Sequence, residues 1–177
     1  TPLVAEFTVK LWEEAGLPSG ALNLVQGARE TGEFLLQAKQ IRGVFFTGSS
    51  QTGQIIHKTL LNRPEVILAM EMGGNNALVV HEVKDLAAAS YLTMQSAYLT
   101  AGQRCTCARR LIVPKGSEGD AFLNTLCSKI KGIQVGGYAD KPEPFMGTVI
   151  HKAAADKVIA ARGALLKKGA NELVQME

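Results

Sequence analysis

Apolar residues recur along the chain with two alternating periods, one typical of helices and one typical of strands. Near the N-terminus an apolar stripe at helical spacing predicts a first helix, which Gly16 ends. Its members are Leu3, Val4, Phe7, Leu11 and Trp12. Further helical patterns cover about residues 30–38, 52–61, 85–99, 120–130 and 152–168. Short apolar runs predict strands at residues 22–25, 43–47, 66–70, 77–80 and 109–113.

Strands that alternate with helices are typical of an α/β fold whose strands run parallel. The run Gly43–Thr47 is apolar at most successive positions, as expected for a strand that is buried on both faces. We therefore predict parallel sheets with helices on both faces.

The composition fits a packed globular protein and narrows the classes of function. The chain has 177 residues, of which 46% are hydrophobic and 20% charged, enough for one domain or parts of two. The net charge is +3 and the Lys and Arg residues are scattered, so a nucleic-acid partner is not expected. We also expect no membrane span, since no apolar stretch approaches roughly 20 residues, and no secretory leader.

Cysteine and histidine are sparse. The three Cys residues, at 105, 107 and 127, argue against a disulfide framework and fit a reducing, cytoplasmic setting. The three His residues are far apart and match no metal-ligand spacing, so no metal site is expected. The chain opens with Thr1-Pro2 and runs at once into a helical pattern, which indicates a piece of a longer protein.

A strand-to-helix turn at residues 47–53 has features that suit a phosphate group. Gly48 allows a tight turn, and the backbone N–H groups from Ser49 onward lie at a helix N-terminus, where the dipole favours an anion. Gly53 allows close packing of the helix on a strand or cofactor. The Lys of an ATP-binding P-loop is missing after Gly53, which disfavours a nucleotide hydrolase. An ordinary turn capped by Ser49 or Ser50 is the alternative.

Two side chains are candidates for covalent and acid–base chemistry. Cys105 lies in a loop between a helix and a strand, where backbone N–H groups and Arg104 favour the reactive thiolate. Glu71 ends an apolar strand at the sheet edge where ligands bind, and partial burial would raise its pKa and make it a usable base. The alternatives are that Cys105 and Cys107 only pack, and that Glu71 simply points to solvent.

Three motifs, in this order, resemble those of the aldehyde dehydrogenase superfamily. They are Phe46-Thr47-Gly48-Ser49 with Gly53, Glu71-Met72-Gly73-Gly74-Asn75, and Gly102-Gln103-Arg104-Cys105. Cys105 follows Glu71 by 34 residues, which matches the family's spacing between base and nucleophile. The opening also fits, with Thr1-Pro2, the Ala15–Gly20 turn and Asn23 before Gly27, so the resemblance covers essentially the whole chain.

Longer strings are similar to one branch of this family, whose members oxidise a succinylated glutamate semialdehyde in bacterial arginine breakdown. These strings are Glu71–Asn76, Thr100–Arg110 and Pro144–Gly147. Because that substrate is a dicarboxylate, Arg104 and Thr106 are candidates for contacting it. Another semialdehyde dehydrogenase of the family is the alternative. A non-catalytic relative is disfavoured, because it would have no need for both Cys105 and Glu71.

The resemblance implies an NAD(P)-dependent dehydrogenase, with NAD favoured. Residues 1–72 would be the C-terminal half of a dinucleotide-binding domain, and residues 73–177 the N-terminal part of a catalytic domain. Cys105 would attack the aldehyde, its backbone N–H would help hold the oxyanion, and Glu71 would activate water to hydrolyse the thioester. The residues implied to contact NAD are Gly27, Thr47, Gly48, Ser49, Ser50, Gln51, Thr52, Gly53, Met72 and Gly73.

Other functional residues of the family lie outside the region that this chain matches. They are the Asn that completes the oxyanion hole, the Lys that contacts the adenosine ribose, and the Glu that binds the nicotinamide ribose. We therefore predict that the 177-residue piece forms no NADH from aldehydes by itself. The resemblance also implies that the full-length protein is a homo-oligomer.

Overall fold

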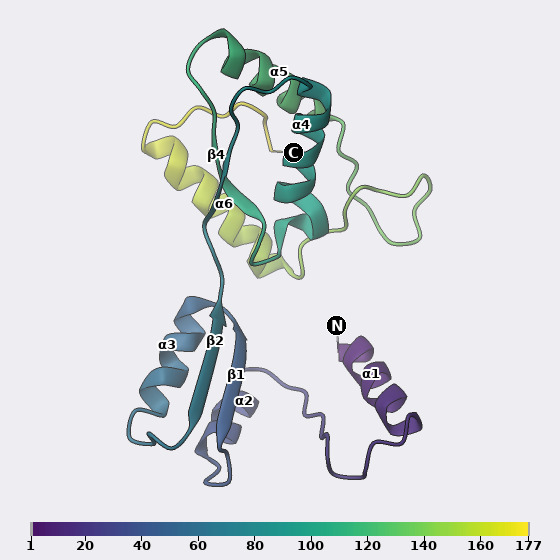
Figure 1. The fold of residues 1–177 in the computed structure, drawn as a ribbon, viewed down its shortest axis with the longest axis vertical. Coiled ribbons are helices and arrows are strands. Elements are labelled where there is room, and N and C mark those ends of the chain that lie inside the picture. Colours follow the sequence, from purple (N-terminus) through teal and green to yellow (C-terminus); the bar gives the residue numbers. More distant parts are fainter. Residues whose placement is uncertain (1, 177) are drawn as a thin grey trace. The chain divides into compact units, whose positions relative to one another are not determined.

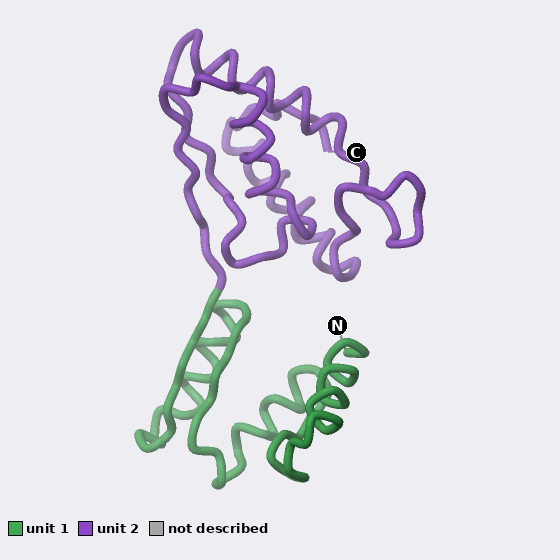
Figure 2. Tube along the Cα trace, turned by 45° about the vertical axis from the view of Figure 1, so that its right-hand side comes forward, with its two compact units in different colours: residues 1–72 green, residues 73–177 purple. Residues whose placement is uncertain are grey.

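Helices and parallel strands build the chain in the computed structural model, which describes residues 2–176 (Figure 1). The elements are α1 (Pro2–Glu14), α2 (Arg29–Gln37), β1 (Gly43–Gly48), α3 (Ser50–Thr59), β2 (Ile67–Met72), β3 (Asn76–Val79), α4 (Leu86–Tyr98), the 3₁₀ helix η1 (Leu99–Gly102), β4 (Ala108–Ile112), α5 (Ser117–Lys131) and α6 (Lys152–Lys167). They form two compact units, residues 1–72 and 73–177, coloured separately in Figure 2. None of the helices within residues 2–176 has both the length and the apolarity needed to cross a membrane.

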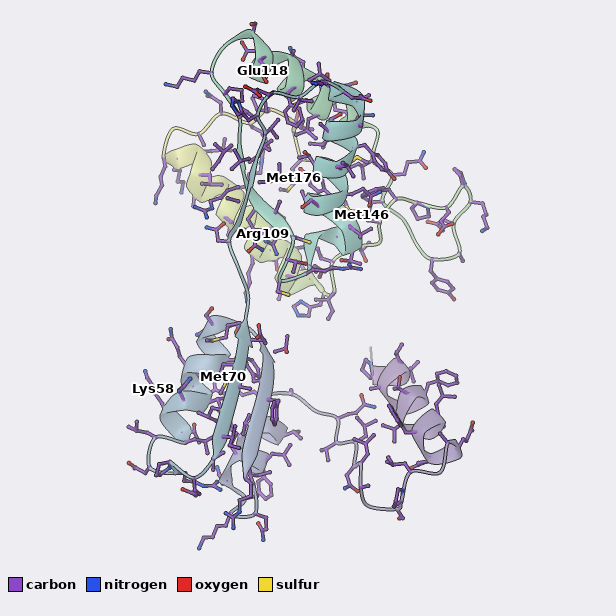
Figure 3. All side chains as sticks on the ribbon, viewed as in Figure 1. Lys58, Met70, Arg109, Glu118, Met146 and Met176 are labelled. Atoms are coloured by element: carbon purple, nitrogen blue, oxygen red, sulfur yellow. The ribbon has the colours of Figure 1, made fainter. Side chains whose placement is uncertain are left out.

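In the first unit a β–α–β arrangement holds a small core. β1 and β2 pair in parallel, with Gly43 opposite Ile67 and Gly48 opposite Met72, and α3 connects them. The buried residues of this core come from α3 and the segment after it, and are Ile56, Leu60 and Val66. Partly buried residues pack against them from both strands and from α2, including Met70, which is labelled in Figure 3.

The second unit repeats this design. β3 and β4 pair in parallel, with Leu78 opposite Leu111. α4 and α5 supply most of the buried core, which consists of Val80, Met94, Phe122 and Leu126. Asp85 caps α4, since its carboxylate accepts the N–H of Ala88 at 2.9 Å. The predicted α/β fold with parallel sheets is therefore confirmed in both units.

Two details of the predicted sheet are wrong. Residues 22–25 form no strand, and Leu22, Leu24 and Val25 are exposed, because no other strand within residues 2–176 pairs with them. β1 is also not buried on both faces, since Phe45 is 82% exposed. Successive strand residues point to opposite faces, and the core around Ile56 covers only one of them.

The side chain of Arg63 forms hydrogen bonds with the segment between the end of α2 and the start of β1. Its guanidinium donates to the carbonyls of Leu36 and Ala38 at 3.2 Å each, and to that of Ile41 at 2.8 Å. The Leu36 carbonyl belongs to the last turn of α2 and has no partner within the helix, so Arg63 satisfies a group that would otherwise need water.

We expect Arg63→Met to lower the free energy of unfolding by about 2 kcal/mol, because it removes several charge-assisted hydrogen bonds while keeping an apolar stem. Urea unfolding of the two proteins measures the difference. Arg29→Met is the matched control, since the ion pair of Arg29 with Glu33 on α2 is exposed and worth less than about 0.5 kcal/mol. An equal loss in both variants would show that Arg63 is an ordinary surface arginine.

Candidate active site

The predicted phosphate turn joins β1 to α3. Ser49 is the N-cap of α3, and its Oγ accepts the N–H of Thr52 at 3.1 Å and lies 2.9 Å from Thr52 Oγ1. The N–H groups of Ser50 and Gln51 have no hydrogen-bond acceptor among residues 2–176. The turn is thus capped by its own serine, and it still presents two donors at a helix N-terminus that an anion can accept.

Gly53 brings the first turn of α3 onto the end of β2. It is buried, and a Cβ built on it would lie 2.4 Å from Met72 Sδ. A larger residue would therefore displace either Met72 or the helix, as the sequence predicted for a glycine that allows close packing.

A cavity of about 740 Å³ lies in the first unit between α2, β1 and α3. Its lining is mostly apolar and includes Ala28, Gly32, Ile55 and the predicted cofactor residues Gln51 and Thr52. Its volume is in the range of small-molecule sites, and the free N–H groups at the N-terminus of α3 lie beside it. These features fit a nucleotide cofactor.

Cys105 occupies an exposed turn immediately before β4, the strand that carries Arg109 in Figure 3. The N–H of Cys107 donates to the carbonyl of Arg104 at 3.2 Å, which closes the turn around Cys105 and Thr106. In a planar trans peptide the C=O and N–H point in opposite directions, so the inward Arg104 carbonyl leaves the Cys105 N–H pointing outward. This N–H has no acceptor within residues 2–176 and is free to stabilise negative charge near the sulfur.

The chain enters this turn through three consecutive left-handed residues. Thr100, Ala101 and Gly102 have φ values of 56°, 55° and 64°. This conformation is unfavourable for Thr and Ala. A Cβ on Gly102 would lie 2.9 Å from the Ala97 carbonyl, so this motif glycine is needed for space as well as for its φ. These residues end the helical path and redirect the chain toward Cys105.

The two nearby cysteines have different environments. Cys105 is exposed, whereas Cys107 is only 3% exposed and its Sγ lies 3.9 Å from the Leu99 carbonyl. The packing interpretation therefore applies to Cys107, and Cys105 is the accessible thiol. All three cysteines are free. No cluster of His, Cys, Asp or Glu suited to a metal occurs in the described part of the chain.

Glu71 lies near the end of β2, opposite Thr47 on β1. It is exposed, so the predicted partial burial is not found in the first unit. The reason is local, because the core around Ile56 covers Met70 but not the last two residues of β2. Glu71 belongs to the first unit and Cys105 to the second.

Arg104 and Thr106, the predicted substrate contacts, flank Cys105 and are both exposed. The Nε of Arg104 donates to Thr100 Oγ1 at 3.1 Å. No carboxylate within residues 2–176 forms an ion pair with Arg104, so its charge is available to a ligand.

One residue of this region is absent from the predicted site. The side-chain amide of Asn76 donates to the carbonyls of Cys105, at 2.6 Å, and Cys107, at 3.2 Å. Its signals in the sequence are a polar amide at the start of an apolar strand and its place at the end of the string Glu71–Asn76.

Comparison with known proteins agrees with the motifs. The model of the aldehyde dehydrogenase family matches residues 1–177. N-succinylglutamate 5-semialdehyde dehydrogenase of Serratia proteamaculans is 51% identical over 177 residues, which is 100% of this chain and 36% of that protein.

Solved structures give the same result. Betaine aldehyde dehydrogenase of Staphylococcus aureus, in complex with NAD+, is 31% identical with a TM-score of 0.88, over 97% of this chain and 34% of that one. An aldehyde dehydrogenase of Brucella melitensis is 35% identical with a TM-score of 0.85, over 97% of this chain and 35% of that one. The chain thus spans about a third of the length of these proteins. It belongs to the aldehyde dehydrogenase family.

Proposed function

We propose that the whole protein is an NAD-dependent aldehyde dehydrogenase that oxidises N-succinyl-L-glutamate 5-semialdehyde to N-succinyl-L-glutamate in arginine catabolism. One observation carries the proposal: an exposed thiol with a free backbone N–H beside it, in a chain that is 51% identical along its whole length to a relative of that name. The cytoplasm is the proposed compartment, because a nucleophilic thiol needs reducing conditions. The active form is proposed to be a homo-oligomer.

The chemistry proposed for Cys105 is nucleophilic attack. The thiolate adds to the aldehyde carbon, and the Cys105 N–H donates to the oxyanion that forms. NAD, when bound, supplies the acceptor for the hydride, which leaves a thioester on the sulfur. Glu71 then takes a proton from a water molecule that attacks the thioester, and the acid is released with the thiolate restored.

The first unit is proposed to contribute to cofactor binding. Residues 1–72 would be half of a dinucleotide-binding domain and residues 73–177 the start of the catalytic domain. The free N–H groups of Ser50 and Gln51 suit a phosphate oxygen, and the apolar cavity beside Thr52 suits an adenine ring. The proposed set is completed by Gly27, Thr47, Gly48, Ser49, Gly53 and Met72 of the first unit, and by Gly73, the first residue of the second.

Steady-state kinetics of the whole protein on a panel of aldehydes tests the substrate. We expect the highest kcat/KM for N-succinylglutamate 5-semialdehyde, compared with succinate semialdehyde, glutamate semialdehyde and a neutral aldehyde. A higher value for another semialdehyde would assign the protein to a different branch of the family. No turnover of any aldehyde would favour the non-catalytic alternative.

Arg104→Met tests the proposed contact with the substrate carboxylates. We expect it to raise KM for the succinylated semialdehyde by about tenfold, because a charge-assisted hydrogen bond to a carboxylate is lost. KM for a neutral aldehyde should stay within about twofold, since that substrate offers no carboxylate to the guanidinium. Equal increases for both substrates would remove Arg104 from the binding site.

A further inference from the structure

We propose that Asn76 is a positioning residue for the nucleophile, and that its amide holds the turn which presents Cys105 to the aldehyde. The inference rests on the proposed function, in which Cys105 is the attacking group. It assigns a separate role to a residue that the chemistry of attack and hydrolysis does not use.

The contacts of Asn76 match its chemistry. Its NH₂ group carries two hydrogens, and two carbonyl oxygens lie within reach, those of Cys105 at 2.6 Å and Cys107 at 3.2 Å. These carbonyls lie on either side of Thr106, so one side chain spans the second half of the turn. A hydroxyl has one hydrogen to donate and an ionised carboxylate has none, so neither Ser nor Asp could make both bonds.

The local backbone brings Asn76 to the turn. Asn76 is the first residue of β3 and pairs with Ala108 of β4, with a shift in register between Asn76 and Ala77. Such irregularities change the direction of a side chain relative to a regular ladder. A Cβ on Gly74 would lie 3.1 Å from the Cys105 carbonyl oxygen and 2.9 Å from Asn76 Oδ1, so this motif glycine leaves room for the contact.

Two hydrogen bonds fix the backbone on both sides of Cys105. The Cys107 N–H orients the peptide between residues 104 and 105, and Asn76 orients the peptide between residues 105 and 106. Because each peptide is planar, both backbone torsions of Cys105 lie between two fixed planes. The position of the sulfur and of the free Cys105 N–H is therefore fixed by a residue of a β-strand and not by a mobile loop. A preorganised nucleophile requires such support.

Two measurements on the whole protein test this role. One is the steady-state kinetics of aldehyde oxidation, and the other is the rate of Cys105 alkylation by iodoacetamide from pH 5 to 10. We expect Asn76→Asp to lower the kcat of aldehyde oxidation by about 100-fold, because a displaced reacting group loses alignment. The pH midpoint of Cys105 alkylation should move upward, since the carboxylate opposes the thiolate. KM for NAD should change less than about twofold, since no cofactor contact is altered.

Uncharged variants separate positioning from charge. Asn76→Ala should lower kcat by a similar factor with a smaller movement of the pH midpoint, and Asn76→Ser should fall between Ala and the native protein. Asn124→Asp, which places the same charge at an exposed position of α5, is the matched control and should leave both readouts unchanged.

Two results have separate meanings. If Cys105→Ala abolishes activity while Asn76→Ala and Asn76→Ser keep the native kcat and alkylation profile, the positioning role is wrong and the proposed function stands. If Cys105→Ala retains activity, the proposed function fails first. If Asn76→Asp does not fold, Asn76→Ala and Asn76→Ser still decide, since neither buries a charge.

Discussion

Replacing Cys105 with Ala is expected to lower the kcat/KM of the whole enzyme by a factor of about 10⁴ or more, because this turn has no other accessible thiol for the covalent route. Cys107 cannot replace it, since that thiol is 3% exposed and its sulfur lies toward the Leu99 carbonyl. NADH formation at saturating NAD and semialdehyde measures the loss.

Cys127→Ala is the control for this variant, because Cys127 is a half-buried residue of α5 outside the turn. It should keep native kcat/KM with a small loss of stability. Activity of Cys105→Ala within tenfold of native would mean that hydride transfer proceeds without the covalent adduct, and the mechanism proposed above would have to be abandoned.

Replacing Glu71 with Gln is expected to separate the two halves of the reaction. The amide cannot take a proton from water, so thioester hydrolysis should slow and kcat should fall by a factor of about 10² to 10⁴. In the proposed mechanism, attack by Cys105 and hydride transfer precede hydrolysis, so one equivalent of NADH per active site should still form rapidly. Stopped-flow absorbance of NADH resolves this burst from the slow steady state.

Glu65→Gln is the matched control in the same unit. Glu65 is an exposed residue before β2 whose pKa is lowered, chiefly by a backbone hydrogen bond, and it lies outside the proposed site. It should show native kcat. If Glu71→Gln gave no burst and lost NADH formation in the first turnover as well, Glu71 would act before hydride transfer, for example by deprotonating Cys105.

Local patterns predicted most of the fold because the signals are themselves local. The apolar period of α3 and the compact runs of β1 and β2 depend only on neighbouring residues. The strand predicted at residues 22–25 failed because a strand depends on a partner, which the pattern of one segment cannot supply. For the same reason the exposed face that carries Phe45 was unexpected.

The site was predicted in part. Motif spacing pointed to Cys105 and Glu71. The spacing of Cys105 and Cys107 does not say which thiol is accessible, since that depends on the burial of Cys107 beside the Leu99 carbonyl. The left-handed path through Thr100 and Ala101 gives no compositional signal, because these residues rarely adopt it. Asn76 was missed because its partners are 29 and 31 residues away.

The most direct test of the central claim is to trap the covalent intermediate. Glu71→Gln enzyme would be mixed with NAD and N-succinylglutamate 5-semialdehyde, quenched in acid and digested for peptide mass spectrometry. We predict a thioester of N-succinylglutamate on the peptide that contains Cys105 and Cys107, with fragment ions that place it on Cys105. A rapid burst of NADH without any acylated Cys105, or acylation of Cys107 instead, would contradict the assignment of the nucleophile.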